Sequence, residues 1–174
     1  MESLYKKALK FAYQAHQGQT RKFSGDPYIF HPIRVANLVA KVIHDNTIEY
    51  YQSVALLHDT VEDCNVCVID LENIHSGISS DILYLTKLPK KSNENRKMFL
   101  ARNNAILADA PHPVRIIKLC DRIDNIMDIP SSEMKNMQYY LEEGDALLEA
   151  ICHGLSKELI DTYFRVRQEA NYAI

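Results

Sequence analysis

Apolar residues recur every three or four positions along most of the chain, which is the spacing of amphipathic α-helices. Near the N-terminus, Ser3 can cap a helix that runs to about His16. The same spacing predicts later helices over about residues 32–43, 48–65, 68–74, 79–85, 95–108, 114–129, 132–152 and 155–170. No strand pattern of any length accompanies them, so we expect an all-α fold.

The loop between the first two predicted helices is rich in residues that favour turns. It holds two glycines and one proline between residues 17 and 27, which indicates an ordered loop with room for a short β-hairpin near residues 20–30. Arg21 and Lys22 are adjacent cations on this loop. They form either a solvated basic pair or a clamp for phosphate, and their spacing alone leaves both readings open.

Residues 56–63 combine metal-ligand chemistry with acid–base chemistry. After two leucines come four polar side chains of those types, namely His58, Asp59, Glu62 and Asp63. In one continuous helix they would share an arc of roughly 140° beside an apolar stripe. A solvated polar face with an incidental histidine is the alternative. Apolar residues that run directly into acids favour a partly buried acidic site, which is costly unless a cation or hydrogen bonds neutralise it.

Two other places offer candidate ligands. His31 precedes Pro32, a residue suited to the first turn of a helix, so His31 is expected at a helix entrance. Asp121 and Asn125 are four residues apart on one predicted helix and are therefore neighbours. Taken alone, the first is more typical of a structural histidine and the second of a solvated helix face.

The remaining His–Asp pair and the cysteines suggest no further site. His44–Asp45 is interpreted as a surface helix end. Cys64 and Cys67 have the spacing of a zinc or redox pair, but no second pair follows. Cys120 and Cys152 lie in apolar helical patterns and are expected to be packed thiols.

Length and composition are those of a globular protein of one domain. The chain has 174 residues, of which 47% are hydrophobic and 25% charged, with a formal net charge of −3. That charge argues against broad binding of nucleic acid but not against a small anionic ligand. No signal peptide and no apolar run of about 18 residues is found, so we expect a cytoplasmic protein without a membrane span.

The order of the candidate ligands resembles the HD superfamily of metal-dependent phosphohydrolases, which carry a histidine before proline, a His–Asp pair and a distant aspartate. Three stretches are similar to the hydrolase domain of RelA/SpoT proteins, at residues 16–32, 56–63 and 118–125. The resemblance covers about residues 4–130. It implies an HD-type helical fold, and we expect residues 1–174 to form a single hydrolase domain.

What the family does follows from this resemblance. Its members hydrolyse the 3′-pyrophosphate of the alarmones ppGpp and pppGpp to GDP or GTP plus pyrophosphate, depend on manganese and lower alarmone levels in the stringent response. The chain ends at Ile174 with no room for a synthetase domain. We therefore expect the free-standing form, a small alarmone hydrolase.

The resemblance also assigns roles to single residues. Two imidazoles and two carboxylates would hold Mn²⁺, namely His31, His58, Asp59 and Asp121, and such a mixed N/O set suits a first-row divalent ion. Glu62 and Asp63 would orient or deprotonate the attacking water and return a proton to the leaving group. Four other residues would contact the nucleotide: Arg21 and Lys22 on the pyrophosphate, Asn125 on the sugar, and Tyr140.

Two alternative functions stay open. The first is an HD phosphohydrolase that acts on another phosphorylated nucleotide such as NADPH. The second is a regulatory module that binds ppGpp without cleaving it, which intact ligands and an intact Glu62–Asp63 pair disfavour. The sequence does not reveal the preference between ppGpp and pppGpp, the oligomeric state, the regulation or a partner synthetase.

Overall fold

The computed structural model describes residues 2–134 and 137–172. Clustering of the backbone separates the chain into two compact units, Met1–Lys87 and Leu88–Ile174, and each is described by itself. Across the described residues the regular elements are helices, joined by one isolated bridge between Thr20 and Pro27. The expected all-α class is therefore confirmed. No helix among the described residues is long and apolar enough to cross a membrane.

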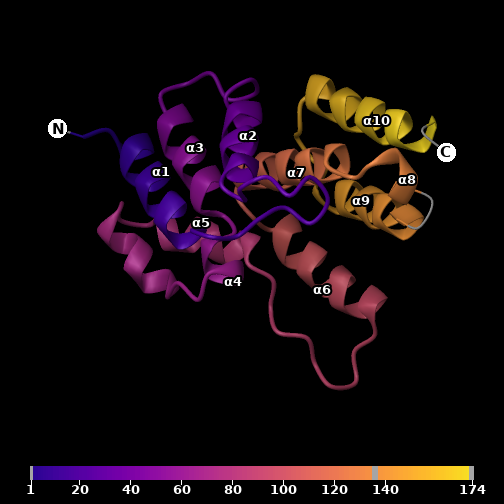
Figure 1. The fold of residues 1–174 in the computed structure, drawn as a ribbon, viewed down its shortest axis with the longest axis horizontal. Helices are drawn as coiled ribbons and strands as arrows, with labels where there is room; N and C mark the ends of the chain where they lie inside the picture. The colour runs from indigo at the N-terminus through magenta and orange to yellow at the C-terminus, as the bar shows by residue number, and fades with distance from the viewer. Residues whose placement is uncertain (1, 135–136, 173–174) are drawn as a thin grey trace. The chain divides into compact units, whose positions relative to one another are not determined.

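The first unit is built around one central helix. Its elements are α1 (Leu4–Ala15), α2 (Phe30–Val39), α3 (Ile48–Leu57), α4 (Thr60–Asp63), the 3₁₀ helix η1 (Val68–Asn73) and α5 (Ile78–Leu85). Helix α3 packs against α1, α2 and α5, and Figure 1 shows it between α1 and α2. Five consecutive residues at its C-terminal end, residues 53–57, are fully buried. The C-terminal half of α3 is therefore part of the core, and the buried His58 follows directly after it.

The helix predicted over residues 48–65 is in fact two helices. Helix α3 ends at Leu57 and α4 begins at Thr60, so His58 and Asp59 lie in the turn between them. Two side chains cause the break, because they bind carbonyls that a continuous helix would use for its own ladder. The His58 ring contacts the Ala55 carbonyl at 2.7 Å, and the Thr60 hydroxyl donates to the Leu57 carbonyl at 2.7 Å.

The loop before α2 folds back on itself without forming strands. The Arg21 amide donates to the Asp26 carbonyl at 2.8 Å, and the Tyr28 amide donates to the Gln19 carbonyl at 2.9 Å. Gly25 turns the chain with a φ of 73°, a left-handed conformation that glycine adopts without strain. The predicted hairpin near residues 20–30 is therefore a compact loop closed by backbone hydrogen bonds.

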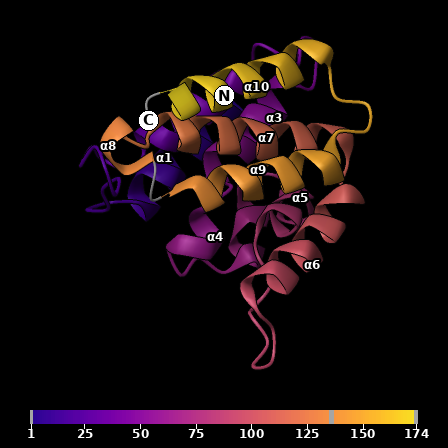
Figure 2. The ribbon, with the colours of Figure 1, turned by 90° about the vertical axis from the view of Figure 1, so that its right-hand side faces the viewer.

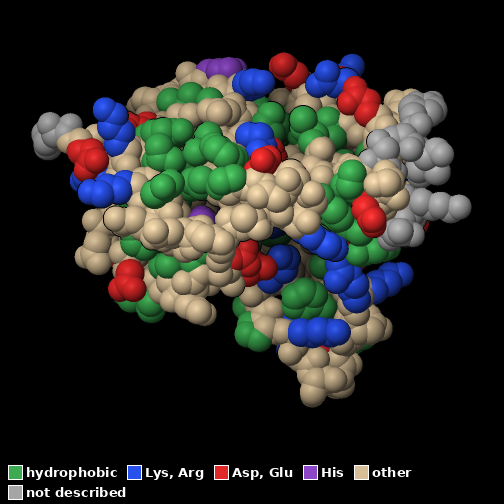
Figure 3. Space-filling model, in the orientation of Figure 1, with side chains coloured by type: hydrophobic (Ala, Val, Ile, Leu, Met, Phe, Trp, Pro, Cys, Tyr) green, Lys and Arg blue, Asp and Glu red, His purple; other side chains and the backbone are tan. Residues whose placement is uncertain are grey.

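The second unit contains five helices among its described residues: α6 (Arg96–Ala108), α7 (His112–Met127), α8 (Ser131–Met134), α9 (Gln138–Ile151) and α10 (Lys157–Tyr172). Helix α7 packs against α9 and α10, and Figure 2 shows it lying between them. Lysine and arginine side chains gather over α6 and the loop before it (Figure 3). Of the single helix predicted over residues 132–152, the structure describes α8 and α9, and residues 135–136 of that prediction lie outside the described residues.

Two details of the second unit differ from the sequence-based expectations. The polar side of α7 is not a solvated face, since Lys118, Asp121 and Asp124 are all buried. Cys152 is exposed because α9 ends at Ile151, so only Cys120 is the packed thiol that was predicted.

Candidate metal centre and acid pair

Three of the predicted metal ligands come together in the first unit. His31 is the second residue of α2, while His58 and Asp59 lie in the turn between α3 and α4. The Asp59 Oδ2 atom lies 3.4 Å from His31 Nε2 and 3.0 Å from His58 Nε2. Both imidazoles are buried and meet edge to face, with ring centroids 5.2 Å apart. One ligand atom from each residue lies within 4.8 Å of the others, so this cluster could hold a metal ion.

The hydrogen bond of His58 determines which of its ring nitrogens faces Asp59 as an acceptor. Since His58 Nδ1 lies 2.7 Å from the Ala55 carbonyl, Nδ1 carries the hydrogen. In a neutral ring Nε2 is then an acceptor, and it faces the Asp59 Oδ2 acceptor at 3.0 Å. Two acceptors so close together in a buried place need a proton or a metal ion between them. Two imidazole nitrogens and a carboxylate oxygen suit a divalent first-row ion.

Glu62 and Asp63 lie on α4, within one helical turn of Asp59. The Glu62 carboxylate accepts hydrogen bonds from the side chain and the backbone amide of Lys87. Partial desolvation and the negative charges of Asp59 and Glu62 raise the pKa of Asp63, although the Tyr28 hydroxyl and Lys87 act in the opposite direction. In the acid pair, Glu62 therefore has a lysine partner, and the pKa of Asp63 lies above that of an ordinary aspartate.

Arg21 and Lys22 have different surroundings. Arg21 is buried, and its guanidinium carbon lies 5.6 Å from the centre of the Tyr28 ring. Lys22 is exposed and its Nζ lies 4.9 Å from the centre of the Phe23 ring. The reading of both as a solvated basic pair is therefore wrong for Arg21.

The other candidates lie in the second unit. Asp121 on α7 is buried and accepts hydrogen bonds from Lys118 Nζ at 2.8 Å and from the Asn125 amide. On α9, the Tyr140 ring is covered by the Arg122 guanidinium, whose carbon lies 4.1 Å from the ring centre. Asp121 as a fourth ligand, and Asn125 and Tyr140 as nucleotide contacts, remain predictions.

Sequence reasoning missed Tyr28. Its hydroxyl donates to Asp59 Oδ2 at 2.7 Å and lies 3.2 Å from Asp63 Oδ2. Nothing in the aromatic run before Pro32 marked this residue, because its partners are more than 30 positions away along the chain.

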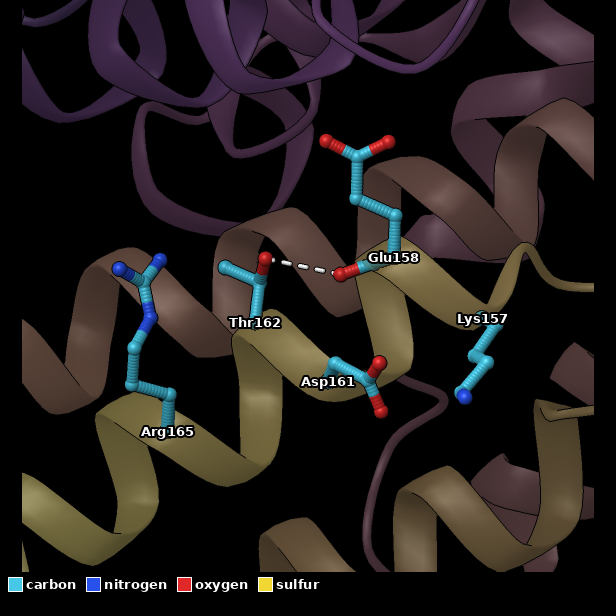
Figure 4. Close-up of a pocket in the computed structure, with 5 residues that line it drawn as sticks. All are labelled: Lys157, Glu158, Asp161, Thr162 and Arg165. Atoms are coloured by element: carbon cyan, nitrogen blue, oxygen red, sulfur yellow. Dashed lines mark hydrogen bonds between the residues drawn. The ribbon is translucent and has the colours of Figure 1, made fainter.

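Two hollows in the second unit are weaker candidates. One, of about 470 Å³, is lined by side chains of α10 alone, and Figure 4 shows charges of both signs with no convergence on a common point. The second, of about 450 Å³, lies between α6 and α9, and there Arg96 is already paired with Glu143. Neither has the convergent ligand atoms of the first unit's cluster.

Comparison with known proteins matches residues 8–147 to the HD domain. The chain belongs to the HD domain family. The matched range contains every residue that the sequence predicted for the site, from Arg21 to Tyr140. An HD domain therefore carries both the histidine–aspartate cluster and the acid pair.

Two of the curated relatives of this chain are named for the same hydrolase activity, whereas others are named as GTP diphosphokinases or GTP pyrophosphokinases. A guanosine-3′,5′-bis(diphosphate) 3′-pyrophosphohydrolase of Vibrio cholerae is 34% identical, over 87% of this chain and 21% of that protein. A probable guanosine-3′,5′-bis(diphosphate) 3′-pyrophosphohydrolase of Mycoplasma pneumoniae is 27% identical, over 98% of this chain and 25% of that protein. The chain thus spans a quarter or less of the length of these relatives.

The fold is also that of a solved structure. A structure described as a metazoan ortholog of SpoT that hydrolyzes ppGpp matches with a TM-score of 0.78, covering 97% of this chain and 96% of that one. At 21% sequence identity this likeness shows a shared fold. The predicted HD-type helical fold is therefore confirmed.

Proposed function

We propose that this HD domain hydrolyses the 3′-pyrophosphate of ppGpp or pppGpp, giving GDP or GTP and pyrophosphate, with Mn²⁺ as its metal. The observation that carries the proposal is the convergence of His31 Nε2 and His58 Nε2 on Asp59 Oδ2, one helical turn from an acid pair. The names of the relatives supply the substrate class. A cytoplasmic location, expected from the sequence, belongs to the same proposal.

The proposed metal site is the cluster of the first unit, and the role of Asp121 as a fourth ligand stays a prediction from the sequence. The His58–Ala55 hydrogen bond keeps the ring in the tautomer whose Nε2 lone pair is available for a ligand bond. A bound ion would act as a Lewis acid and polarise the phosphoryl group under attack. The ring of His31 is buried and held against His58, so both donors are placed before an ion arrives.

The acid pair would move the protons of the reaction. Water attacks phosphorus, the bond between phosphorus and the 3′-oxygen breaks, and the 3′-oxygen has to gain a proton. Glu62, held by Lys87, is suited to orienting the water and accepting its proton. Asp63, whose pKa is raised, is suited to donating a proton to the leaving oxygen.

The buried Arg21 would neutralise the pyrophosphate, because a guanidinium can donate two parallel hydrogen bonds to phosphate oxygens. Lys22, which is exposed, would add a mobile positive charge. Asn125 and Tyr140 would contact the nucleoside part of the substrate.

The test is incubation of the purified chain with ppGpp and Mn²⁺, with products resolved by anion-exchange chromatography. We expect GDP and pyrophosphate, lost with a chelator and in the His58→Ala and Asp59→Asn variants. His153→Ala, which changes an exposed histidine, is the matched control and should retain activity. Cleavage of NADPH in a parallel reaction, with ppGpp left intact, would contradict the proposed substrate.

A further inference from the structure

Tyr28 contacts both halves of the proposed site. Its hydroxyl donates at 2.7 Å to Asp59 Oδ2, the same oxygen that faces the two imidazoles. The same hydroxyl lies 3.2 Å from Asp63 Oδ2. One phenol therefore lies between a candidate metal ligand and a candidate catalytic acid.

The Tyr28 ring is held on several sides. The His16 ring stacks on it with a centroid distance of 4.7 Å and an interplanar angle of 24°. The edge of His31 meets it at 5.6 Å, and the Arg21 guanidinium carbon lies 5.6 Å from its centre. A ring packed in this way has few alternative rotamers, so the position of its hydroxyl is fixed.

A second contact joins the same loop to the acid helix. The Gln19 side-chain amide donates to the Asp63 backbone carbonyl at 3.0 Å, while its oxygen lies 2.7 Å from His16 Nδ1. Gln19 and Tyr28 thus tie the loop that carries Arg21 to the end of α4. Both ties come from the segment just before α2, which itself contributes His31.

We infer that Tyr28 is a positioning residue for the proposed hydrolysis: its hydroxyl orients the Asp59 carboxylate toward the two imidazoles and sets its separation from Asp63, while its ring supports Arg21. This inference rests on the proposed function, but its first consequence concerns metal binding alone. Removal of a partner that orients a metal ligand typically lowers metal affinity or activity by about 10–100-fold.

The decisive variant is Tyr28→Phe, which retains the ring and its stacking and removes the hydroxyl. We expect the dissociation constant for Mn²⁺, measured on metal-free protein by electron paramagnetic resonance, to rise by about 10-fold or more. In saturating Mn²⁺ we expect kcat to fall by about 10-fold or more, because Asp63 is no longer held, with KM changed by less than about threefold, because Arg21 keeps its support.

Tyr50→Phe is the matched control in the same unit. The Tyr50 hydroxyl donates to Asp81 Oδ2 at 2.9 Å, so this variant also removes a tyrosine–carboxylate hydrogen bond. It should leave Mn²⁺ affinity and kcat unchanged. A melting temperature of metal-free Tyr28→Phe within the range of Tyr50→Phe would exclude general unfolding as the cause of its losses.

The outcomes separate this inference from the proposed function. Wild-type affinity for Mn²⁺ and wild-type kcat in Tyr28→Phe would overturn the positioning role while leaving the hydrolase proposal intact. A wild-type protein that binds Mn²⁺ but leaves ppGpp intact would overturn the hydrolase proposal, and a weaker Mn²⁺ site in Tyr28→Phe would still support the positioning of Asp59. A wild-type protein that does not bind Mn²⁺ would overturn both.

Discussion

Carboxylates of the two units have opposite surroundings. In the first unit, Asp59, Glu62 and Asp63 lie within five residues of one another, and the pKa of Asp63 is raised. In the second unit, the Glu94 carboxylate accepts two hydrogen bonds of 2.8 Å from the Arg102 guanidinium, and these lower the pKa of Glu94 to about 2. Asp63, whose neighbours are acids, is the group for which we propose chemistry, whereas Glu94, which is paired with an arginine, is expected to contribute to stability.

Other pairs of the second unit follow the pattern of Glu94. Asp145 accepts from Arg167 at 2.6 Å and from the Tyr163 hydroxyl at 2.9 Å, and Glu143 accepts from Arg96. These acids are neutralised by the protein itself. The cluster of His31, His58 and Asp59 is proposed to bind an added metal ion, so we expect loss of a carboxylate to have opposite effects in the two units.

The largest effect is expected at the acid pair. Glu62→Gln and Asp63→Asn should each lower kcat by about 10²–10⁴-fold, because each removes a group that moves a proton. Stability should not fall in Asp63→Asn, because removal of this charge relieves its repulsion from Asp59 and Glu62. Steady-state kinetics and urea unfolding measure the two quantities. Turnover retained in both variants would contradict their proposed role.

The second effect concerns the metal. With free Mn²⁺ at about 100 times its dissociation constant, wild-type protein should gain about 2.7 kcal/mol of stability. Asp59→Asn, which preserves volume, should lose most of this gain. Thermal unfolding with and without Mn²⁺ tests it. Equal gains in the variant and the wild type would place the metal elsewhere.

Glu94→Gln should have the opposite effects to substitutions in the acid pair: kcat should stay at the wild-type value, and stability should fall. Since the pKa of Glu94 is about 2 in the folded chain and 4.5 ordinarily, its stabilising contribution is present above pH 4.5 and is lost as the pH falls toward 2. The difference in stability between wild type and variant should therefore shrink as the pH falls from 4.5 toward 2, which urea unfolding at a series of pH values measures. A constant difference would show that the Arg102 pair is not its source.

The smallest effect is expected for Arg96→Gln. The side chain of Arg96 is 63% exposed, so its pair with Glu143 is screened by solvent and should contribute less than about 1 kcal/mol. Urea unfolding at low and high salt measures this contribution. A loss of several kcal/mol would mean that exposure does not separate strong from weak pairs in this unit.

The sequence predicted the elements of the fold better than the details of the site. Helical spacing located most of the helices, and Pro32 correctly placed His31 at the start of α2, although the helix begins at Phe30, two residues earlier than predicted. The pattern did not reveal the break between α3 and α4, because it arises from side-chain bonds of His58 and Thr60 to carbonyls. Amphipathic spacing is insensitive to such local competition for hydrogen bonds.

The sequence indicated His58, Asp59, Glu62 and Asp63 as candidate site residues because residues of these types lie close together in it. It did not find Tyr28, whose role depends on contacts with residues 31 and 35 positions away. A tyrosine is as common in a core as in a site, so only tertiary structure distinguishes the two uses.

The measurement that tests the central claim most directly is pyrophosphate release from ppGpp by the wild-type chain, Asp63→Asn and Glu94→Gln in one Mn²⁺-containing buffer. We predict release by the wild type and by Glu94→Gln, none with a chelator, and at least about a hundredfold slower release by Asp63→Asn. No release by the wild type under conditions where Mn²⁺ binds would contradict the account, and so would equal rates in wild type and Asp63→Asn.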